Sequence, residues 1–357
     1  MKGHRFSEKI LSRLKAPGGG EDTNLEQADE GLRCVETGEL YPYVDGIPSL
    51  YQSSEGEGAE VTGRVKSFYE ENPFPNYEGV EEFGALVSKG FQNPFTRQLL
   101  DAVGYNKTIL ECGCGTGQMS HFLQLNNNHT LGIDLSLGSL SLGVGYKLTN
   151  SLPRSNFAQM NLFDLAVKDA SFDVVISHGV LHHTFDARRA FGQIVRKVKP
   201  GGIVIVGLYN YYARVPTWLR SHLIGLFGPR IDYVVRSRVR DARKAEIWIR
   251  DQYYNPHETW HSIDEVMGWF RENDVEYLNC SPAILGTDAE DTPELFTHTS
   301  PGNRTLRVVT QLSWLASIAR EGALFDVIGG ITWMALHRRG SPGREGNRRS
   351  GSPCVRA

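Results

Sequence analysis

Three glycines stand at alternate positions directly after an apolar run, in the stretch ILECGCGTGQ at residues 109–118. A glycine-rich turn at the end of a strand typically brings the backbone close to a bound nucleotide. A phosphate-binding P-loop needs four residues between its glycines, followed by Lys and Ser or Thr. The dinucleotide fingerprint needs a third glycine at position 118, which is Gln here. Neither phosphate-binding pattern therefore matches.

Strand-like runs alternate with helical segments through the middle of the chain. The runs cover residues 108–112, 130–134, 156–161, 172–177 and 202–208. Nearly all-apolar strands that alternate with helices indicate a parallel sheet covered on both faces. Ligands bind at the carboxyl edge of such sheets, where Glu111, Asp134, Asp164 and His178 would lie.

The pattern E-x-G-x-G-x-G, in which Glu111 precedes Gly113, resembles the cofactor loop of class I S-adenosylmethionine-dependent methyltransferases of type 11/12. Four later segments are similar to that family in the same order: LGIDLS, NLFDL, FDVVISHGVLHHT and VKPGGIVIVGL. The resemblance covers residues 61–210 closely. It implies S-adenosylmethionine as the cofactor and a Rossmann-like α/β fold. That fold has a mainly parallel seven-stranded sheet, helices on both faces, and here a helical insert after the fifth strand.

The resemblance also implies which residues hold this cofactor. Glu111 would suit the positive methionine end, Asp134 would accept the ribose hydroxyls, and Asp164 would hold the adenine amino group beside Phe163. The implied set is Glu111, Gly113, Cys114, Gly115, Thr116, Gly117, Gln118, Asp134, Leu135, Asn161, Phe163, Asp164, Ser177 and His178. The alternative for Asp134 and Asp164 is that they only form turns at strand ends.

Three histidines, His178, His182 and His183, follow the fourth strand. One of them could act as a general base, and the others could shape the pocket or cap the next helix. The sequence does not rank them.

The segment HETWH at 257–261 matches the zinc-protease pattern H-E-x-x-H. That motif needs a helix so that both histidines face one way. Pro256 precedes the segment, and a capping box at Ser262 and Glu265 places the helix after it. We therefore expect no metal site here. Cys112 and Cys114 are interpreted as small packing residues, because no second cysteine pair accompanies them.

Residues 211–261 are predicted to form a helical, Arg-rich insert or lid; within 213–250, nine residues are basic and three acidic. We expect acceptor recognition here, through Tyr209, Tyr211, His257 and His261. A small or mid-sized organic acceptor is favoured. An RNA acceptor is possible but less favoured, because the fourth strand lacks the Asn/Asp-Pro-Pro-Tyr loop. A non-catalytic cofactor-binding subunit and an NAD-dependent oxidoreductase remain alternatives, as does a purely structural role for the insert.

The two ends of the chain are expected to be less regular. Residues 1–60 resemble the small zinc-ribbon-like domain found with some methyltransferases, but only Cys34 remains of its ligands, so we expect no metal. Residues 16–32 are predicted to be a loop, and 41–51 to form short strands. Residues 262–339 would complete the sheet, with its last strand at 329–339, and the tail at 340–357 has a disordered composition.

Composition sets the broad class. The chain has 40% hydrophobic and 22% charged residues and a net charge of −3, as in soluble globular proteins. Five cysteines without a paired framework, together with an N-terminus that lacks an apolar signal core, favour the cytoplasm. No apolar stretch is long enough to span a bilayer. The sequence makes no prediction of the oligomeric state.

Overall fold

A seven-stranded sheet forms the centre of the computed structural model, which describes residues 5–53, 56–228, 231–237, 242–285, 294–320 and 322–332. Its strand order is β10-β11-β9-β8-β5-β6-β7. The strands are β5 (Thr108–Cys112), β6 (His129–Asp134), β7 (Ser155–Gln159), β8 (Phe172–His178), β9 (Val198–Tyr209), β10 (Val275–Ser281) and β11 (Leu324–Ile331). Only β11 runs antiparallel to its neighbours, so the predicted class I methyltransferase fold is confirmed.

Both faces of the sheet are covered by helices. Neighbouring residues of each strand point to opposite faces, so the apolar side chains of both faces need a packing partner. Ile109 packs in a core cluster with α4 (Pro94–Val103) and α5 (Gln118–Leu123). Leu110 belongs to a second cluster, with α7 (Ala187–Val195) and α11 (Ile263–Glu272). All five residues of β5 are buried, which explains its continuous apolar run.

Three helices precede or flank the edge where the parallel strands end. They are α2 (Ala59–Glu71), α3 (Phe83–Gln92) and, after β6, α6 (Leu137–Thr149). Glu70 accepts hydrogen bonds from the backbone N–H groups of Leu137 and Gly138, at 2.9 and 2.7 Å. A carboxylate at a helix N-terminus is favourable, so this contact fixes α2 against the start of α6.

The N-terminal segment forms a small antiparallel sheet, contrary to the predicted loop at 16–32. Its helix is α1 (Glu8–Leu11) and its strands are β1 (Leu25–Gln27), β2 (Gly31–Cys34), β3 (Leu40–Val44) and β4 (Ile47–Pro48). Composition obscured β1 and β2, whereas the predicted strands within 41–51 are present. A Cβ at Gly31 would lie 2.1 Å from the Tyr41 carbonyl oxygen, so only glycine allows this pairing.

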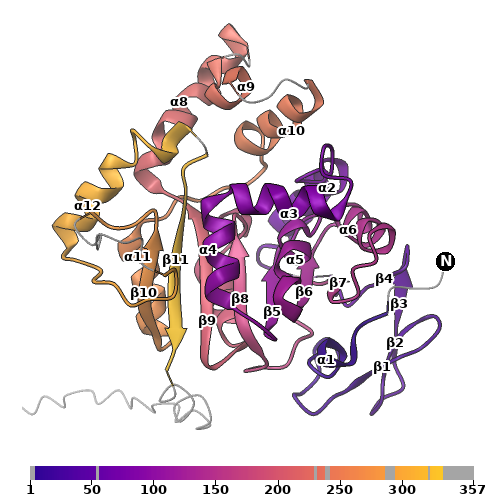
Figure 1. Cartoon of the computed structure of the whole chain (residues 1–357). Helices are drawn as coiled ribbons and strands as arrows, with labels where there is room; N and C mark the ends of the chain where they lie inside the picture. Colours follow the sequence, from indigo (N-terminus) through magenta and orange to yellow (C-terminus); the bar gives the residue numbers. More distant parts are fainter. Residues whose placement is uncertain are drawn as a thin grey trace, which may run out of the picture.

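The segment after β9 is helical, as expected, and its helices rise together beyond one end of the sheet (Figure 1). They are α8 (Tyr211–Phe227), α9 (Tyr233–Ser237) and α10 (Ala242–Tyr253). Asn210 caps α8 by accepting from the N–H groups of Tyr212 and Ala213. None of the described helices is long and apolar enough to cross a membrane.

The last strand of the chain differs from its predicted position. The sequence predicts the last strand at 329–339, but β11 begins at Leu324, where its pairing with Tyr209 of β9 starts. Residues 333–339 and the predicted tail at 340–357 lie outside the described part of the chain. Ahead of α12 (Arg304–Ser313), α11 begins as predicted, with the Ser262 hydroxyl accepting from the Glu265 N–H.

Candidate active site

The glycine turn between β5 and α5 needs its glycines for two reasons. Gly115 has a φ of +54° and Gly117 a φ of +80°, a region that side chains rarely adopt. A Cβ at Gly115 would also lie 2.3 Å from the Phe74 carbonyl oxygen, and one at Gly117 would lie 2.3 Å from the Phe157 ring. The backbone of the turn therefore packs closely against Phe74 and Phe157, with no space for side chains at these two positions.

A cavity of about 450 Å³ lies over the carboxyl ends of β5, β6 and β8. From the predicted cofactor set, its lining contains Glu111, Gly113, Cys114, Gly115, Gln118, Asp134, Leu135, Asn161, Phe163 and His178. Thr116, Gly117, Asp164 and Ser177 are outside the lining. Thr116 and Ser177 are bound to the backbone, because their hydroxyls donate to the carbonyl oxygens of Pro75 and Cys112.

Two carboxyl groups face this cavity from neighbouring strands. Glu111 is buried and accepts a 2.5 Å hydrogen bond from the Ser120 hydroxyl. Burial raises the pKa of Glu111 to about 7, although Ser120 and the nearby His178 act in the opposite direction. Asp134 accepts from the N–H groups of Gly115 and Ser136, and burial raises its pKa as well. A positively charged ligand would favour the ionised forms of both groups.

The loop after β7 supplies an aromatic wall. Asn161 accepts from the Phe163 N–H at 3.1 Å, which shapes the loop. The Phe163 ring contacts Phe185 with a centroid distance of 4.3 Å, and the Arg189 guanidinium lies 5.7 Å from both rings. Phe163 thus presents a flat apolar surface to the cavity.

Residues 74–77 form a strap over the glycine turn that sequence reasoning missed. The Thr116 hydroxyl donates to the Pro75 carbonyl at 2.6 Å, and the Gln118 amide donates to the Asn76 carbonyl at 2.6 Å. The Tyr77 hydroxyl donates to the Thr116 carbonyl, also at 2.6 Å. Two prolines within the aromatic stretch NPFPNY are the only sequence signal for this extended, rigid segment.

The structure separates the three candidate histidines. His178 and His183 line the cavity, whereas His182 is not part of the lining. His182 is fully buried, stacks on Tyr209 at 3.8 Å, and has no hydrogen-bond partner at either ring nitrogen among the described residues. Burial therefore lowers its pKa well below the usual value.

His178 pairs with Asp326 across a glycine. The three residues His178, Gly207 and Asp326 lie in register on β8, β9 and β11. The His178 Nδ1 is 2.7 Å from Asp326 Oδ1, and a Cβ at Gly207 would collide with both atoms. Burial acts to lower the pKa of His178, but the Asp326 carboxylate raises it overall.

His183 is bound by a backbone carbonyl and not by a carboxylate. Its Nδ1 lies 2.8 Å from the His257 carbonyl oxygen. A carbonyl can only accept, so Nδ1 carries the proton and Nε2 keeps a lone pair. Burial lowers the pKa of His183, which keeps the ring neutral near pH 7. A neutral imidazole on the cavity wall is suited to accepting a proton.

The far end of the cavity is built by α2, β9 and α10. Its lining there includes Tyr69, Tyr209, Trp248, Asp251 and Gln252. The Tyr69 hydroxyl donates to Asp251 Oδ1 at 3.1 Å. The Gln252 amide donates to Asp251 Oδ2 at 2.9 Å and to the Tyr209 hydroxyl at 3.1 Å. Apart from Tyr209, sequence reasoning missed these residues, because they are far apart in the chain and belong to no motif.

Among the other predicted acceptor residues, Tyr211, His257 and His261 are outside the lining. Tyr211 is 53% exposed at the start of α8. Both ring nitrogens of His261 are engaged, with Thr259 at 2.8 Å and Glu265 at 3.0 Å. His257 contributes its carbonyl oxygen to His183 rather than its ring.

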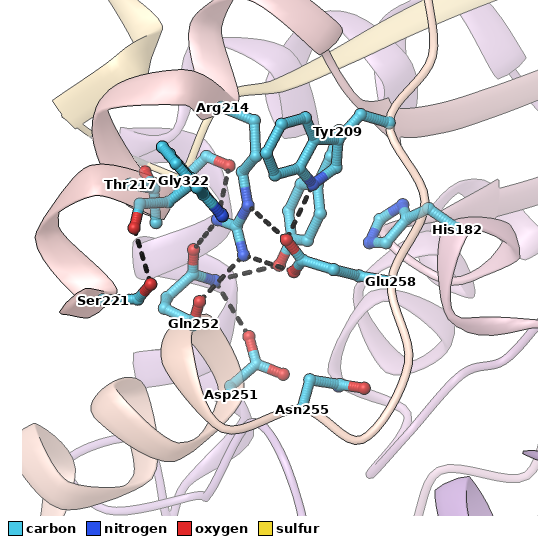
Figure 2. A network of polar contacts seen from close by, with 12 residues as sticks. His182, Tyr209, Arg214, Thr217, Ser221, Asp251, Gln252, Asn255, Glu258 and Gly322 are labelled. Carbon is cyan, nitrogen blue, oxygen red and sulfur yellow. Dashed lines mark hydrogen bonds and ion pairs between the residues drawn. The ribbon is translucent and has the colours of Figure 1, made fainter.

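A buried arginine holds the far end together (Figure 2). Arg214 is 1% exposed, lies 3.8 Å over the Tyr209 ring, and binds Glu258 through Nε and Nη2 at 3.2 and 2.6 Å. It also donates to the side chain and the carbonyl of Gln252, and to the carbonyl of Gly322. Glu258 of the HETWH segment is thus an ion-pair partner. The segment is not helical, and the described residues contain no group of three potential metal ligands.

The family model for a methyltransferase domain matches residues 110–206, which contain the glycine turn and most of the strands β5 to β9. A Synechococcus protein described as uncharacterized is 27% identical over 201 residues, or 48% of each chain. Ubiquinone biosynthesis O-methyltransferase from Cronobacter sakazakii is 25% identical, over 48% of this chain and 63% of its own. Demethylmenaquinone methyltransferase from Paenarthrobacter aurescens is 24% identical, over 62% of this chain and 83% of its own. The chain thus spans about half to two thirds of the first two relatives.

Proposed function

We propose that this chain transfers a methyl group from S-adenosylmethionine to a small or mid-sized organic acceptor, because residues 110–206 match the family model for a methyltransferase domain. One observation carries the proposal: a single cavity joins the glycine turn and strand-end carboxylates to a polar, aromatic end under α10. Two relatives are named for methylation in ubiquinone biosynthesis and of demethylmenaquinone, which also supports an organic acceptor.

S-adenosylmethionine is the cofactor of such domains, and the described residues fit it. When bound, it supplies an electrophilic methyl group on a positively charged sulfur. Glu111 and Asp134 are buried acids that favour a cationic partner, and the glycine turn allows close backbone contact. Phe163 would cover the adenine ring, and Asp134 would accept from the ribose hydroxyls.

The remaining residues position the acceptor and take its proton. Tyr209 and Tyr69 give flat walls with polar tips, which suits an organic molecule carrying a nucleophilic group. Since His183 Nε2 has a free lone pair on the cavity wall, it is our choice of general base. Holding the nucleophile, methyl carbon and sulfur in line under α10, away from water, is the main catalytic contribution.

The test begins with binding. Calorimetry should detect S-adenosylmethionine and S-adenosylhomocysteine, while NAD and ATP should bind far more weakly. Incubation with methyl-labelled S-adenosylmethionine and cell extract should then place the label in the small-molecule fraction. Tighter binding of NAD would overturn the cofactor assignment, and a label confined to RNA or protein would overturn the acceptor class.

A further inference from the structure

Asp251 is a buried carboxylate in the cavity wall that has no ion-pair partner in the described part of the chain. It is 9% exposed, and its oxygens accept only from neutral donors, the Tyr69 hydroxyl and the Gln252 amide. Buried charges are normally paired, because desolvation of an isolated charge is costly. A cationic ligand could therefore supply the ion-pair partner that Asp251 lacks among the described residues.

The nearest cation cannot fill that role. All five N–H donors of Arg214 are already used by Glu258, Gln252 and Gly322, and its charge is balanced by Glu258 (Figure 2). Arg214, Glu258 and Asp251 thus bring two carboxyl groups and only one arginine together beside the cavity.

The two lysines that line the cavity are engaged elsewhere. The Lys66 ammonium lies 4.7 Å over the Tyr51 ring, and the Lys89 ammonium donates to Gln118 at 3.1 Å. The surface around Asp251 is aromatic instead: Tyr69, Tyr209 and Trp248 share that end of the lining. A carboxylate beside aromatic faces is the usual environment for an organic ammonium group.

Resting on the proposed function, we propose that the methyl acceptor is an amine, whose ammonium group binds Asp251 between Tyr69, Tyr209 and Trp248. Trp248 Nε1 is buried and has no hydrogen-bond partner in the part of the chain that the structure describes, so it would donate to an oxygen elsewhere on the acceptor. The ammonium proton passes to His183 Nε2, which leaves a neutral nitrogen with its lone pair. That lone pair forms the new N–C bond while the C–S bond breaks and its electrons remain on sulfur.

The test compares phenethylamine with 2-phenylethanol, which differ in the charged group. Both are titrated into the full-length protein by calorimetry, with and without saturating S-adenosylhomocysteine. We expect the amine to bind at least about tenfold more tightly than the alcohol, as for a charge-assisted hydrogen bond. Asp251→Asn should abolish this preference and leave the affinity for S-adenosylhomocysteine unchanged. The control Asp101→Asn removes an equal charge from the exposed face of α4 and should behave as wild type.

Three results would count against the amine. Equal affinity for the amine and the alcohol in the wild-type protein would refute it, while the proposed function survived through S-adenosylhomocysteine binding. A loss of S-adenosylhomocysteine affinity in Asp251→Asn would assign this carboxylate to the cofactor. A tenfold preference that survives in Asp251→Asn would place the amine site elsewhere. Absence of S-adenosylhomocysteine binding would instead refute the proposed function.

A separate observation concerns the outer face of α8. Large apolar side chains lie exposed there at helical spacing: Tyr211, Val215, Trp218, Leu219, Leu223, Leu226 and Phe227. Leu226 is 79% exposed and Phe227 is 68% exposed. Helix α12, which packs against α8, and the turn after it add exposed Val309, Leu312 and Leu315. The apolar stripe that usually faces a core faces outward here.

The charged residues of α8 and α12 themselves are of one sign. Neither α8 nor residues 301–320 contain an Asp or Glu, although the chain has 41 acidic residues. Basic groups are present instead: Arg220 on α8 and the exposed Arg304 on α12, while Arg307 is already paired with Asp264. A helix with a Trp-, Phe- and Leu-rich face, flanked by arginines and free of acids, is typical of segments that lie in a membrane interface.

We propose that the α8 face binds an anionic lipid surface, with Trp218, Leu219, Leu226 and Phe227 inserted at the headgroup boundary. The charge complementarity with anionic lipids favours this occupant over a second copy of the chain, whose own α8 face would bring the same positive charge. The same helix carries Arg214, so the bound surface would lie beside the acceptor end of the cavity.

Co-sedimentation of the full-length protein with vesicles tests this. We expect binding to vesicles of phosphatidylglycerol and phosphatidylcholine, and at least about tenfold weaker binding to phosphatidylcholine alone. Leu219→Glu with Leu226→Glu should abolish the binding. Leu142→Glu with Leu148→Glu adds the same charge on exposed positions of α6 and should retain it.

Equal loss in both double variants would overturn the assignment to α8, as would binding that does not depend on lipid charge. Absence of vesicle binding, combined with a dimer in size-exclusion chromatography that the α8 variant dissociates, would show that this face joins two copies instead.

Discussion

The two ends of the cavity, which we propose bind the cofactor and the acceptor, are built in different ways. The cofactor end comes from the carboxyl edges of adjacent strands, and backbone groups of the glycine turn and the strap at 74–77 hold it. The acceptor end comes from α2, β9 and α10, and side chains around Arg214 hold it. The first end is formed by turns next to strand ends and is held by backbone hydrogen bonds. The second end depends on side-chain contacts between residues that are far apart in the sequence. We therefore expect mutations at the two ends to separate cofactor binding from acceptor binding.

The largest effect should come from Arg214→Met. It leaves the partly buried Glu258 without its cation, so we expect unfolding to become easier by up to about 3 kcal/mol. Denaturant unfolding with intrinsic fluorescence measures this. Arg220→Met, on the same helix but only partly buried, should cost far less. Equal losses in the two variants would show that the network does not determine the stability of the acceptor end.

Asp134→Ala should weaken S-adenosylhomocysteine binding by about 1–3 kcal/mol, because the ribose hydroxyls lose their acceptor. Calorimetry gives this value, and circular dichroism checks that the variant is folded. Phenethylamine should bind this variant as it binds the wild type, which would show that the two ends of the cavity bind their ligands separately. An unchanged affinity for S-adenosylhomocysteine would remove Asp134 from the cofactor end.

The sequence predicted the cofactor end more fully than the acceptor end, and the reason is physical. Glu111, Gly115 and Asp134 lie where parallel strands end, and the strand pattern alone brings those ends to one edge. Tyr69, His183 and Asp251 meet only because Glu70 fixes α2 on α6 and Arg214 fixes α10 on β9. Periodicity carries no signal for such contacts.

Single polar residues in unexpected places were the available clues. Asp326 stands inside an otherwise apolar strand, and its partner His178 lies two strands away across Gly207. The sequence predicted the last strand at 329–339 instead, whereas β11 begins at Leu324. Small N-terminal strands were likewise hidden by their loop-like composition around Leu25 and Gly31.

Glu111→Gln should change how stability depends on pH. Burial raises the pKa of Glu111 from 4.5 to about 7, so its contribution to stability is fully present below pH 4.5 and is lost as pH rises through 7. Between pH 6 and pH 8 the cofactor-free wild type should lose about 1 kcal/mol more than Glu111→Gln. Urea unfolding at both values measures this. Parallel losses would mean that Glu111 is not desolvated.

Tyr77→Phe should give the smallest effect. It removes the hydroxyl that donates to the Thr116 carbonyl, which costs about 0.5–1.5 kcal/mol of stability at the strap. Hydrogen exchange of the glycine turn should rise, while that of α10 stays constant. Faster exchange in α10 as well would mean that the two ends are coupled rather than separate.

The most direct measurement is label transfer from methyl-labelled S-adenosylmethionine, made with wild type, Asp134→Ala and Asp251→Asn in the same extract. The account predicts label in a small molecule with wild type and little label with either variant, and only Asp134→Ala should have lost cofactor affinity. Normal label transfer by Asp251→Asn, or a label that wild type places only in RNA or protein, would contradict it.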